Sequence, residues 1–126
     1  MHKILVCDDE IDVCDFIKHF FQDRGFEVTC SLDGEEAVRI ARKQKFDVIL
    51  LDVRMKKMSG IDALKNIRKN DDKVNVIMVT AVEDQDKMDD AKRLGVSHYI
   101  TKPLVLEELE SIIYKVTNKQ AETKKK

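Results

Sequence analysis

The feature that most constrains the fold of this chain is a regular alternation of two patterns. Short apolar runs alternate with longer segments whose apolar residues recur at helical spacing, five times along 126 residues. Two runs, Val48–Leu51 and Val76–Val79, are apolar at every position, which is typical of strands covered by helices on both faces. The pattern predicts strands at Lys3–Cys7, Glu27–Cys30, Val48–Leu51, Val74–Val79 and His98–Ile100.

The segments between the runs predict amphipathic helices. Five helices are expected, around Val13–Phe21, Ala37–Ala41, Ile61–Ile67, Met88–Leu94 and Leu106–Val116. Strands that alternate with helices imply a parallel sheet with right-handed crossovers. We therefore predict an α/β domain: a doubly wound, five-stranded parallel sheet with helices on both faces, in a flavodoxin-like (βα)5 arrangement.

Charge and apolar patterning exclude several classes of protein. Lys and Arg number 23 against 24 Asp and Glu, so the balance argues against nucleic-acid binding by bulk electrostatics. No signal peptide is recognisable, and no apolar stretch approaches the roughly 20 residues of a membrane span. Cys7, Cys14 and Cys30 have no metal-ligand spacing and are interpreted as free, mostly buried thiols. We expect a cytoplasmic protein without direct nucleic-acid or membrane binding.

Polar residues stand at the ends of four predicted strands. Asp8 and Asp9 follow the first strand, Asp52 the third, Thr80 the fourth and Lys102 the fifth. The carboxyl ends of parallel strands meet at one edge of the sheet, where α/β domains bind their ligands. Three carboxylates repel one another unless a cation joins them, and Mg²⁺ prefers such oxygen ligands. One carboxylate can then attack a phosphoryl group, and the lysine stabilises the charge.

Each of these residues alone has an ordinary structural explanation. An aspartate after a strand often caps a helix or forms a turn, so Asp8-Asp9-Glu10 could simply cap the helix that follows. Thr80 could be a cap as well, and Lys102 before Pro103 could be a solvated turn residue. Complementary groups at successive strand ends nevertheless favour a common site.

In these residues the chain resembles the receiver domains of two-component response regulators. The resemblance covers residues 3–117, and it predicts a receiver domain at 1–117 followed by a polar tail or the start of a linker at 118–126. The motifs that carry it are Asp8-Asp9, Val48-Ile-Leu-Leu-Asp52, Ser59-Gly60, Val79-Thr80-Ala81 and Thr101-Lys102-Pro103.

The resemblance implies a role for each residue of the metal site. Asp52 would be the phosphoacceptor, modified by a phosphohistidine of a sensor histidine kinase or by a phosphotransfer protein. Mg²⁺ would be bound directly by Asp9, through water by Asp8, by Asp52, and by the backbone carbonyl of Arg54. The domain would be no enzyme beyond its own phosphorylation and dephosphorylation.

The resemblance also implies a switch. Thr80 and Lys102 would contact the phosphoryl oxygens, and the Lys102–Pro103 peptide bond would be cis. Thr80 and Tyr99 would move after phosphorylation. The surface formed by the helix around Met88–Leu94, the strand His98–Ile100 and the helix around Leu106–Val116 would then change for an effector, an output domain or a second copy.

Departures from the family and other classes of protein remain open at this point. Lys56 follows Met55 where receivers usually have proline, so the loop after Asp52 loses a conformational constraint. One alternative is a pseudo-receiver that signals by protein contact without phosphorylation. A haloacid-dehalogenase-like phosphatase would need an Asp-x-Asp motif after the first strand, and a nucleotide-binding module would need a glycine-rich loop. Neither pattern is present in the sequence.

Overall fold

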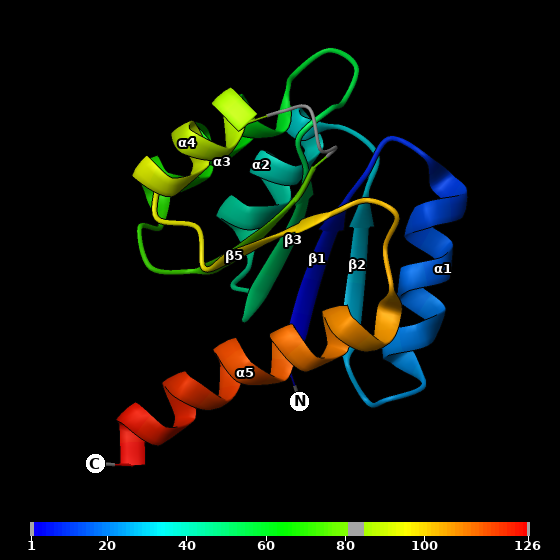
Figure 1. Ribbon diagram of the computed structural model, residues 1–126, viewed down its shortest axis with the longest axis vertical. Helices are drawn as coiled ribbons and strands as arrows, with labels where there is room; N and C mark the ends of the chain where they lie inside the picture. The colour runs from blue at the N-terminus through cyan, green and yellow to red at the C-terminus, as the bar shows by residue number, and fades with distance from the viewer. Residues whose placement is uncertain (1, 81–84, 126) are drawn as a thin grey trace.

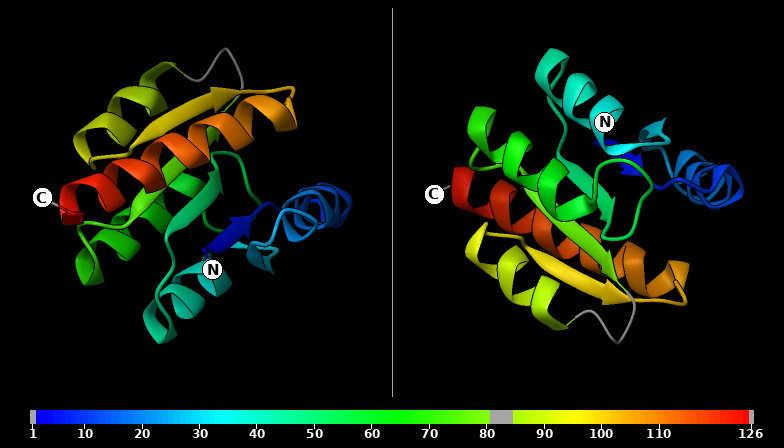
Figure 2. Two further views of the ribbon diagram at one scale, coloured as in Figure 1. Left: turned by 90° about the horizontal axis from the view of Figure 1, so that it is seen from below. Right: turned by 90° about the horizontal axis from the view of Figure 1, so that it is seen from above.

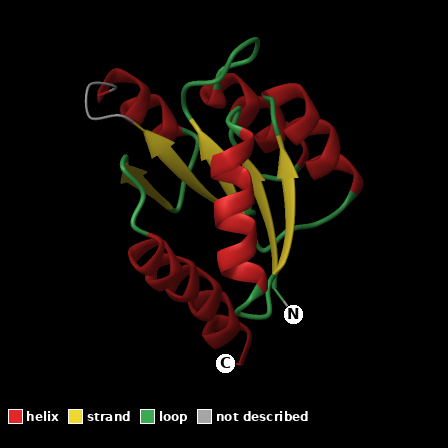
Figure 3. Cartoon of the chain, turned by 90° about the vertical axis from the view of Figure 1, so that its right-hand side faces the viewer, coloured by secondary structure: helices red, strands yellow, loops and turns green. Residues whose placement is uncertain are grey.

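Five parallel strands form one sheet in the order β2-β1-β3-β4-β5, which confirms the predicted flavodoxin-like fold. The computed structural model describes residues 2–80 and 85–125. Figure 1 shows the elements, and the arrowheads in Figure 3 point the same way. The elements are β1 (Lys3–Cys7), α1 (Ile11–Gln22), β2 (Glu27–Ser31), α2 (Gly34–Lys43), β3 (Val48–Asp52), α3 (Gly60–Asn70), β4 (Asn75–Thr80), α4 (Gln85–Arg93), β5 (His98–Thr101) and α5 (Leu106–Lys125).

The strands end later than their apolar runs predict. β3 ends at Asp52 and β4 at Thr80, because both residues still pair with the neighbouring strand although their side chains are polar. Val74 lies before β4 instead of inside it, and it is buried. The predicted boundaries were therefore wrong by one residue at these ends, and the correction places two of the predicted site residues on the sheet itself.

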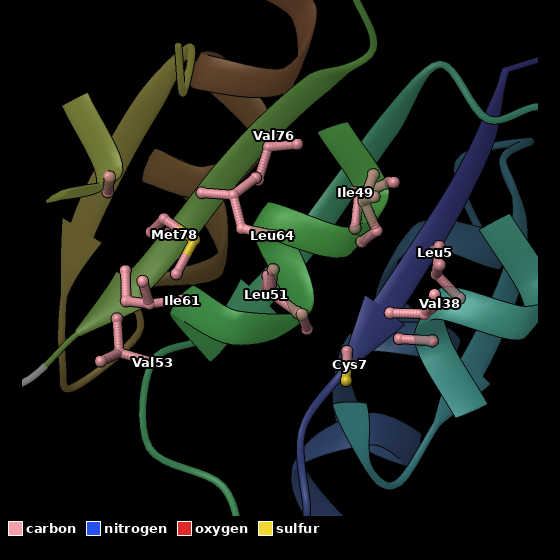
Figure 4. Close-up of a cluster of buried hydrophobic side chains, with 14 of the residues drawn as sticks. Leu5, Cys7, Val38, Ile49, Leu51, Val53, Ile61, Leu64, Val76 and Met78 are labelled. Carbon is pink, nitrogen blue, oxygen red and sulfur yellow. The ribbon is translucent and has the colours of Figure 1, made fainter. Parts of the chain in front are cut away.

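Two apolar layers cover the sheet. In β1, Leu5 and Cys7 face one layer, whereas Ile4 and Val6 face the other, as the pleat requires. Helices α2, α3 and α4 contribute to the first layer, and α1 and α5 to the second. Figure 4 shows part of the first layer, and Figure 2 shows the order of the strands from two sides. Burial on both faces explains why the central strands are continuously apolar.

The loop between β3 and α3 closes against the end of β3. The amide of Gly60 donates to the carbonyl of Val53 at 2.9 Å. Ser59 caps α3, since its hydroxyl accepts a hydrogen bond from the amide of Asp62 at 3.2 Å. Lys57 has a φ of 58°, a left-handed conformation that favours glycine. The loop after β3, in which Lys56 stands where receivers usually have proline, thus also contains Lys57 in a strained backbone conformation.

Replacing Lys57 by glycine should stabilise the domain by about 0.5–1 kcal/mol, because the left-handed conformation no longer costs energy. Lys56→Gly is the matched control, and it should destabilise slightly through the greater entropy of the unfolded chain. Urea unfolding monitored by circular dichroism measures both effects. A Lys57→Gly variant less stable than Lys56→Gly would contradict this explanation.

The carboxyl-terminal helix is longer than the apolar stripe alone suggested. α5 continues without interruption to Lys125. The division into a domain at 1–117 and a tail or linker at 118–126 therefore stays a prediction. Within the described ranges, none of the helices combines the length and the apolar character that crossing a membrane requires.

Candidate functional site

Three of the predicted site residues are buried at the carboxyl end of the sheet. Asp8 directly follows β1, Asp52 is the last residue of β3, and Thr80 is the last residue of β4. Asp8, Asp52 and Thr80 are 3%, 4% and 1% exposed. Buried carboxylates need partners, because an unpaired charge without solvent is costly. The apolar strands therefore hold these groups in a place where their chemistry depends on one another.

Lys102 supplies the positive charge between the carboxylates. It follows β5, and its amide donates to the carbonyl of Thr80 at 2.8 Å, which fixes its position next to β4. Its Nζ atom lies 2.8 Å from Oδ2 of Asp52 and 3.8 Å from Oδ2 of Asp8. The Lys102–Pro103 peptide bond is cis, as predicted. The structure thus brings the ammonium group of Lys102 into direct contact with Asp52.

The ionisation of these groups reflects both burial and charge. Burial raises the pKa of Asp8 to about 6; the amide of Glu10 and the Lys102 charge oppose this rise, and the Asp52 charge adds to it. For Lys102, burial lowers the pKa, but the hydrogen bond and charge of Asp52, with the charges of Asp8 and Glu10, outweigh it, so the net pKa is raised. The site therefore holds more negative charge than one lysine neutralises.

The raised pKa of Asp8 means that this site lowers the free energy of unfolding of the metal-free protein when Asp8 is charged. A carboxyl whose pKa is raised on folding favours the native state below its unfolded pKa of 3.8, and this contribution is lost as pH rises through about 6. At pH 7.5 the charged Asp8 therefore destabilises the domain. Asp8→Asn should stabilise the metal-free protein by about 1–2 kcal/mol there, since one pKa unit corresponds to about 1.4 kcal/mol.

Urea unfolding without metal at pH 7.5 and pH 5 measures this effect. The advantage of Asp8→Asn over the native sequence should shrink at the lower pH, where Asp8 in the native protein takes up its proton. Asp15→Asn, at an exposed position of α1, is the control and should show little change at either pH. An Asp8→Asn advantage that grows as pH falls would show that Asp8 is not the strained group.

A group of carboxylate oxygens that includes Asp8, the neighbour of Lys102, could hold a divalent cation. One oxygen from each of Asp8, Asp9 and Glu10 lies within 4.8 Å of the others, in the part of the chain that the structure describes. Hard carboxylate oxygens are what Mg²⁺ prefers, so the donor set fits this ion. Glu10 was not predicted to belong to this acidic group, although its position directly after Asp8-Asp9 was a usable signal.

Backbone amides hold three of the carboxylates in place. The amide of Arg54 donates to Oδ1 of Asp52 at 3.1 Å, and the amide of Lys56 donates to Oδ2 of Asp9 at 3.4 Å. Asp8 uses Oδ1 to accept from the amide of Glu10 at 2.9 Å, whereas the side chain of Glu10, the N-cap of α1, makes no cap bond. Capping alone therefore does not account for the acidic cluster.

The two predicted switch residues lie on neighbouring strands. The Thr80 side chain is buried at the end of β4, and Tyr99 on β5 is half-buried against the layer of α2, α3 and α4. Lys92 of α4 lies over the Tyr99 ring, with Nζ at 6.0 Å from its centroid. Ala81, which belongs to one of the predicted motifs, lies outside the described residues.

Comparison with known proteins agrees with this geometry. The sequence model of the response regulator receiver domain matches residues 4–114. The chain is 34% identical over 121 residues to the regulatory protein AtoC of Escherichia coli, covering 96% of this chain and 26% of that protein. The chain thus spans about a quarter of AtoC.

Solved structures show the same similarity over nearly whole chains. The chemotaxis protein CheY4 of Vibrio cholerae superposes with a TM-score of 0.85 at 33% identity, covering 92% of this chain and 98% of that one. The receiver domain of the sensor histidine kinase PA1611 of Pseudomonas aeruginosa, with a magnesium ion in its active site cleft, has a TM-score of 0.84 at 30% identity, covering 93% and 98%. The chain belongs to the response regulator receiver domain family.

Proposed function

We propose that Asp52 accepts a phosphoryl group from the phosphohistidine of a sensor histidine kinase or a phosphotransfer protein, in a Mg²⁺-dependent reaction. The observation that carries this proposal is the contact of 2.8 Å between Asp52 and Lys102, with Asp8 on the same lysine at 3.8 Å. A nucleophilic carboxylate, a cation for the phosphoryl oxygens and an acidic metal site are thereby adjacent. A pseudo-receiver would have no use for a cluster whose charges destabilise it.

The metal would be held by the carboxylates of Asp8, Asp9 and Asp52 and by the backbone carbonyl of Arg54. When bound, Mg²⁺ neutralises charge on the phosphoryl oxygens that the carboxylates would otherwise repel. The ion in the related PA1611 receiver domain supports this assignment. Mg²⁺ at roughly ten times its dissociation constant should stabilise the native fold by about 1.4 kcal/mol.

The side chains then have separate tasks. Asp52 attacks phosphorus through one carboxylate oxygen, the bond to the histidine nitrogen breaks, and an aspartyl phosphate forms. Lys102 moves from the carboxylate to a phosphoryl oxygen and stabilises its charge. The Thr80 hydroxyl donates a hydrogen bond to another phosphoryl oxygen. The domain catalyses its own phosphorylation and dephosphorylation and no other reaction.

The phosphoryl donor would dock on the α1 side of the site. Ile11 and Phe16 of α1 are 58% and 62% exposed, and Val105 before α5 is 45% exposed. The salt bridge of 2.6 Å between Arg24 and Glu110 joins the turn after α1 to α5. Exposed apolar side chains near a charged site suit a protein partner. The exchange would take place in the cytoplasm, which suits the three free cysteines.

Output would use the other side of the site. Thr80 would move towards the phosphoryl group, and Tyr99 would fill the space behind it, because a buried void is costly. The surface of α4, β5 and α5 would change and be recognised by an effector, an output domain or a second copy of the chain.

Incubation with a small-molecule phosphodonor tests this function. With Mg²⁺, intact mass spectrometry should show one added phosphoryl group that is lost in mild base, as expected of an acyl phosphate. A chelator added beforehand should prevent the addition. Equal incorporation with and without Mg²⁺ would contradict the Mg²⁺ dependence, and no incorporation under any condition would support the pseudo-receiver instead.

A further inference from the structure

Two of the three cysteines face each other across α1 and β2. Cys14 is buried on α1, and Cys30 is half-buried on β2. Both belong to the apolar layer of α1 and α5, whereas Cys7 lies in the layer on the opposite face of the sheet. The sheet therefore separates Cys7 from the other two. We call Cys14 and Cys30 the thiol pair.

The contacts of the thiol pair place each sulfur on the backbone near the other. Sγ of Cys30 donates to the carbonyl of Cys14 at 3.6 Å. Sγ of Cys14 donates to the carbonyl of Ser31, the residue after Cys30, at 3.7 Å, and to the carbonyl of Asp8 at 3.4 Å. The contact of Cys30 with Cys14 joins residues 16 positions apart and that of Cys14 with Ser31 joins residues 17 apart, so both depend on the packing of α1 against β2.

The two thiols differ in their ionisation. The neighbouring Cys14 thiol is the main cause that lowers the pKa of Cys30; burial opposes it, and the charge of Lys18 supports it. Cys14 is 1% exposed, so its side chain is shielded from solvent. Cys30 thus carries the more readily formed thiolate, which is the nucleophilic form of cysteine, beside a protonated thiol.

We propose that the thiol pair is an oxidation site: a hydroperoxide oxidises Cys30, and Cys14 then closes a reversible disulfide between α1 and β2. This inference does not depend on phosphorylation of Asp52. Cys30, which is half-buried, provides the point of attack, and buried Cys14 provides the resolving thiol at the same helix–strand contact. A disulfide here would also remove the Cys14 hydrogen bond to the Asp8 carbonyl.

The chemistry balances with the hydroperoxide as the only added reactant. The Cys30 thiolate attacks the terminal peroxide oxygen, the O–O bond breaks, and the sulfur loses two electrons to become a sulfenic acid. The released alkoxide or hydroxide takes up a proton. The Cys14 sulfur then attacks the sulfenic sulfur, forms the S–S bond and expels water, which carries away the Cys14 proton.

Cys7 provides an internal control. It is 1% exposed, and its thiol contacts Sδ of Met55 at 3.3 Å. A buried thiol of this kind is inert. Cys30 should therefore react with iodoacetamide in the native protein roughly tenfold faster than Cys7, or more.

The test uses the reduced, complete chain and a small excess of hydrogen peroxide, followed by alkylation and digestion. A protease that cleaves after glutamate is required, because cleavage after Glu10 separates Cys7 from Cys14, and cleavage after Glu27 separates Cys14 from Cys30. We expect an intramolecular Cys14–Cys30 disulfide that dithiothreitol reverses, with Cys7 alkylated only after denaturation.

Three variants make the outcome decisive. Cys7→Ser should form the same disulfide, and Cys30→Ser should form none. Cys14→Ser should accumulate a Cys30 sulfenic acid that dimedone traps. The unsubstituted chain decides the outcome, so a variant that fails to fold does not affect the test. The proposal is overturned if this chain yields Cys30 sulfinic acid without a disulfide, or a disulfide that contains Cys7, or three unreacted thiols.

Discussion

Replacing Gly60 by alanine is expected to destabilise the domain by about 3 kcal/mol or more, the upper end of the usual cost of overpacking, because backbone atoms block the added Cβ. A Cβ atom at Gly60 would overlap the carbonyl oxygen of Asp52 and lie 2.8 Å from its carbonyl carbon and 2.9 Å from Cα of Val53. These are backbone atoms at the end of β3. They cannot move aside without breaking the hydrogen bond of 2.9 Å from the Val53 amide to the Val79 carbonyl.

Gly25→Ala is the control for the loss of a glycine alone. Gly25 has a φ of +86° with no atom within 4 Å of an added Cβ, so alanine there should cost only about 1–2 kcal/mol. Urea unfolding compares the two variants. The close packing of Gly60 on Asp52 would be wrong as described if Gly60→Ala cost no more than Gly25→Ala.

Asp52→Ala is expected to reduce phosphorylation by small-molecule donors at least about a hundredfold, because it removes the proposed nucleophile. The variant should remain folded, since Lys102 keeps its ion pair with Asp8 at 3.8 Å. The space left by the Asp52 carboxylate lies at the carboxyl end of the sheet and not in its apolar core. The removal of one buried carboxylate also reduces the repulsion with Asp8.

The control for this variant is Asp62→Ala. Asp62 is exposed in the first turn of α3, on the loop side of the same region, and takes no part in the acidic cluster. Phosphoryl incorporation is followed by intact mass spectrometry with donor and Mg²⁺ in excess. Loss of labelling in both variants would point to damage of the loop, and retained labelling in Asp52→Ala would remove Asp52 from its proposed role.

The fold could be predicted from the sequence because its signal is repeated. Burial on both faces makes Val48–Leu51 apolar throughout, and no amphipathic surface strand has that pattern. The ends of β3 and β4 could not be predicted, since Asp52 and Thr80 pair in the sheet while their side chains are polar. At these strand ends the backbone continues to pair in the sheet after the apolar run has ended, so composition does not give the boundary.

The place of the site residues could be predicted, but not their contacts. The rule that strand ends meet at one edge placed Asp8, Asp52 and Lys102 together. The contact of Lys102 with Asp52 at 2.8 Å and its second contact with Asp8 depend on the turn after β5. No spacing in the sequence describes this turn. The cis Lys102–Pro103 bond was expected only from the resemblance to the family.

Long-range contacts of single side chains gave no signal. Arg68 of α3 donates to four carbonyls, and it joins the loop before β4 to the loop before β5, although the sequence marks it only as a polar helix residue. Cys14 and Cys30 likewise meet only because α1 packs on β2. A spacing of 16 residues resembles no motif, so only the fold shows the pair.

The most direct measurement of the central claim is to locate the phosphoryl group. The phosphorylated domain is reduced with borohydride, which converts an aspartyl phosphate to homoserine, and the digested chain is sequenced by mass spectrometry. The account predicts homoserine at position 52 and at no other aspartate, and none in a sample that received chelator before the phosphodonor. Homoserine at Asp8 or Asp9, or a phosphoryl group on histidine with position 52 unchanged, would contradict it.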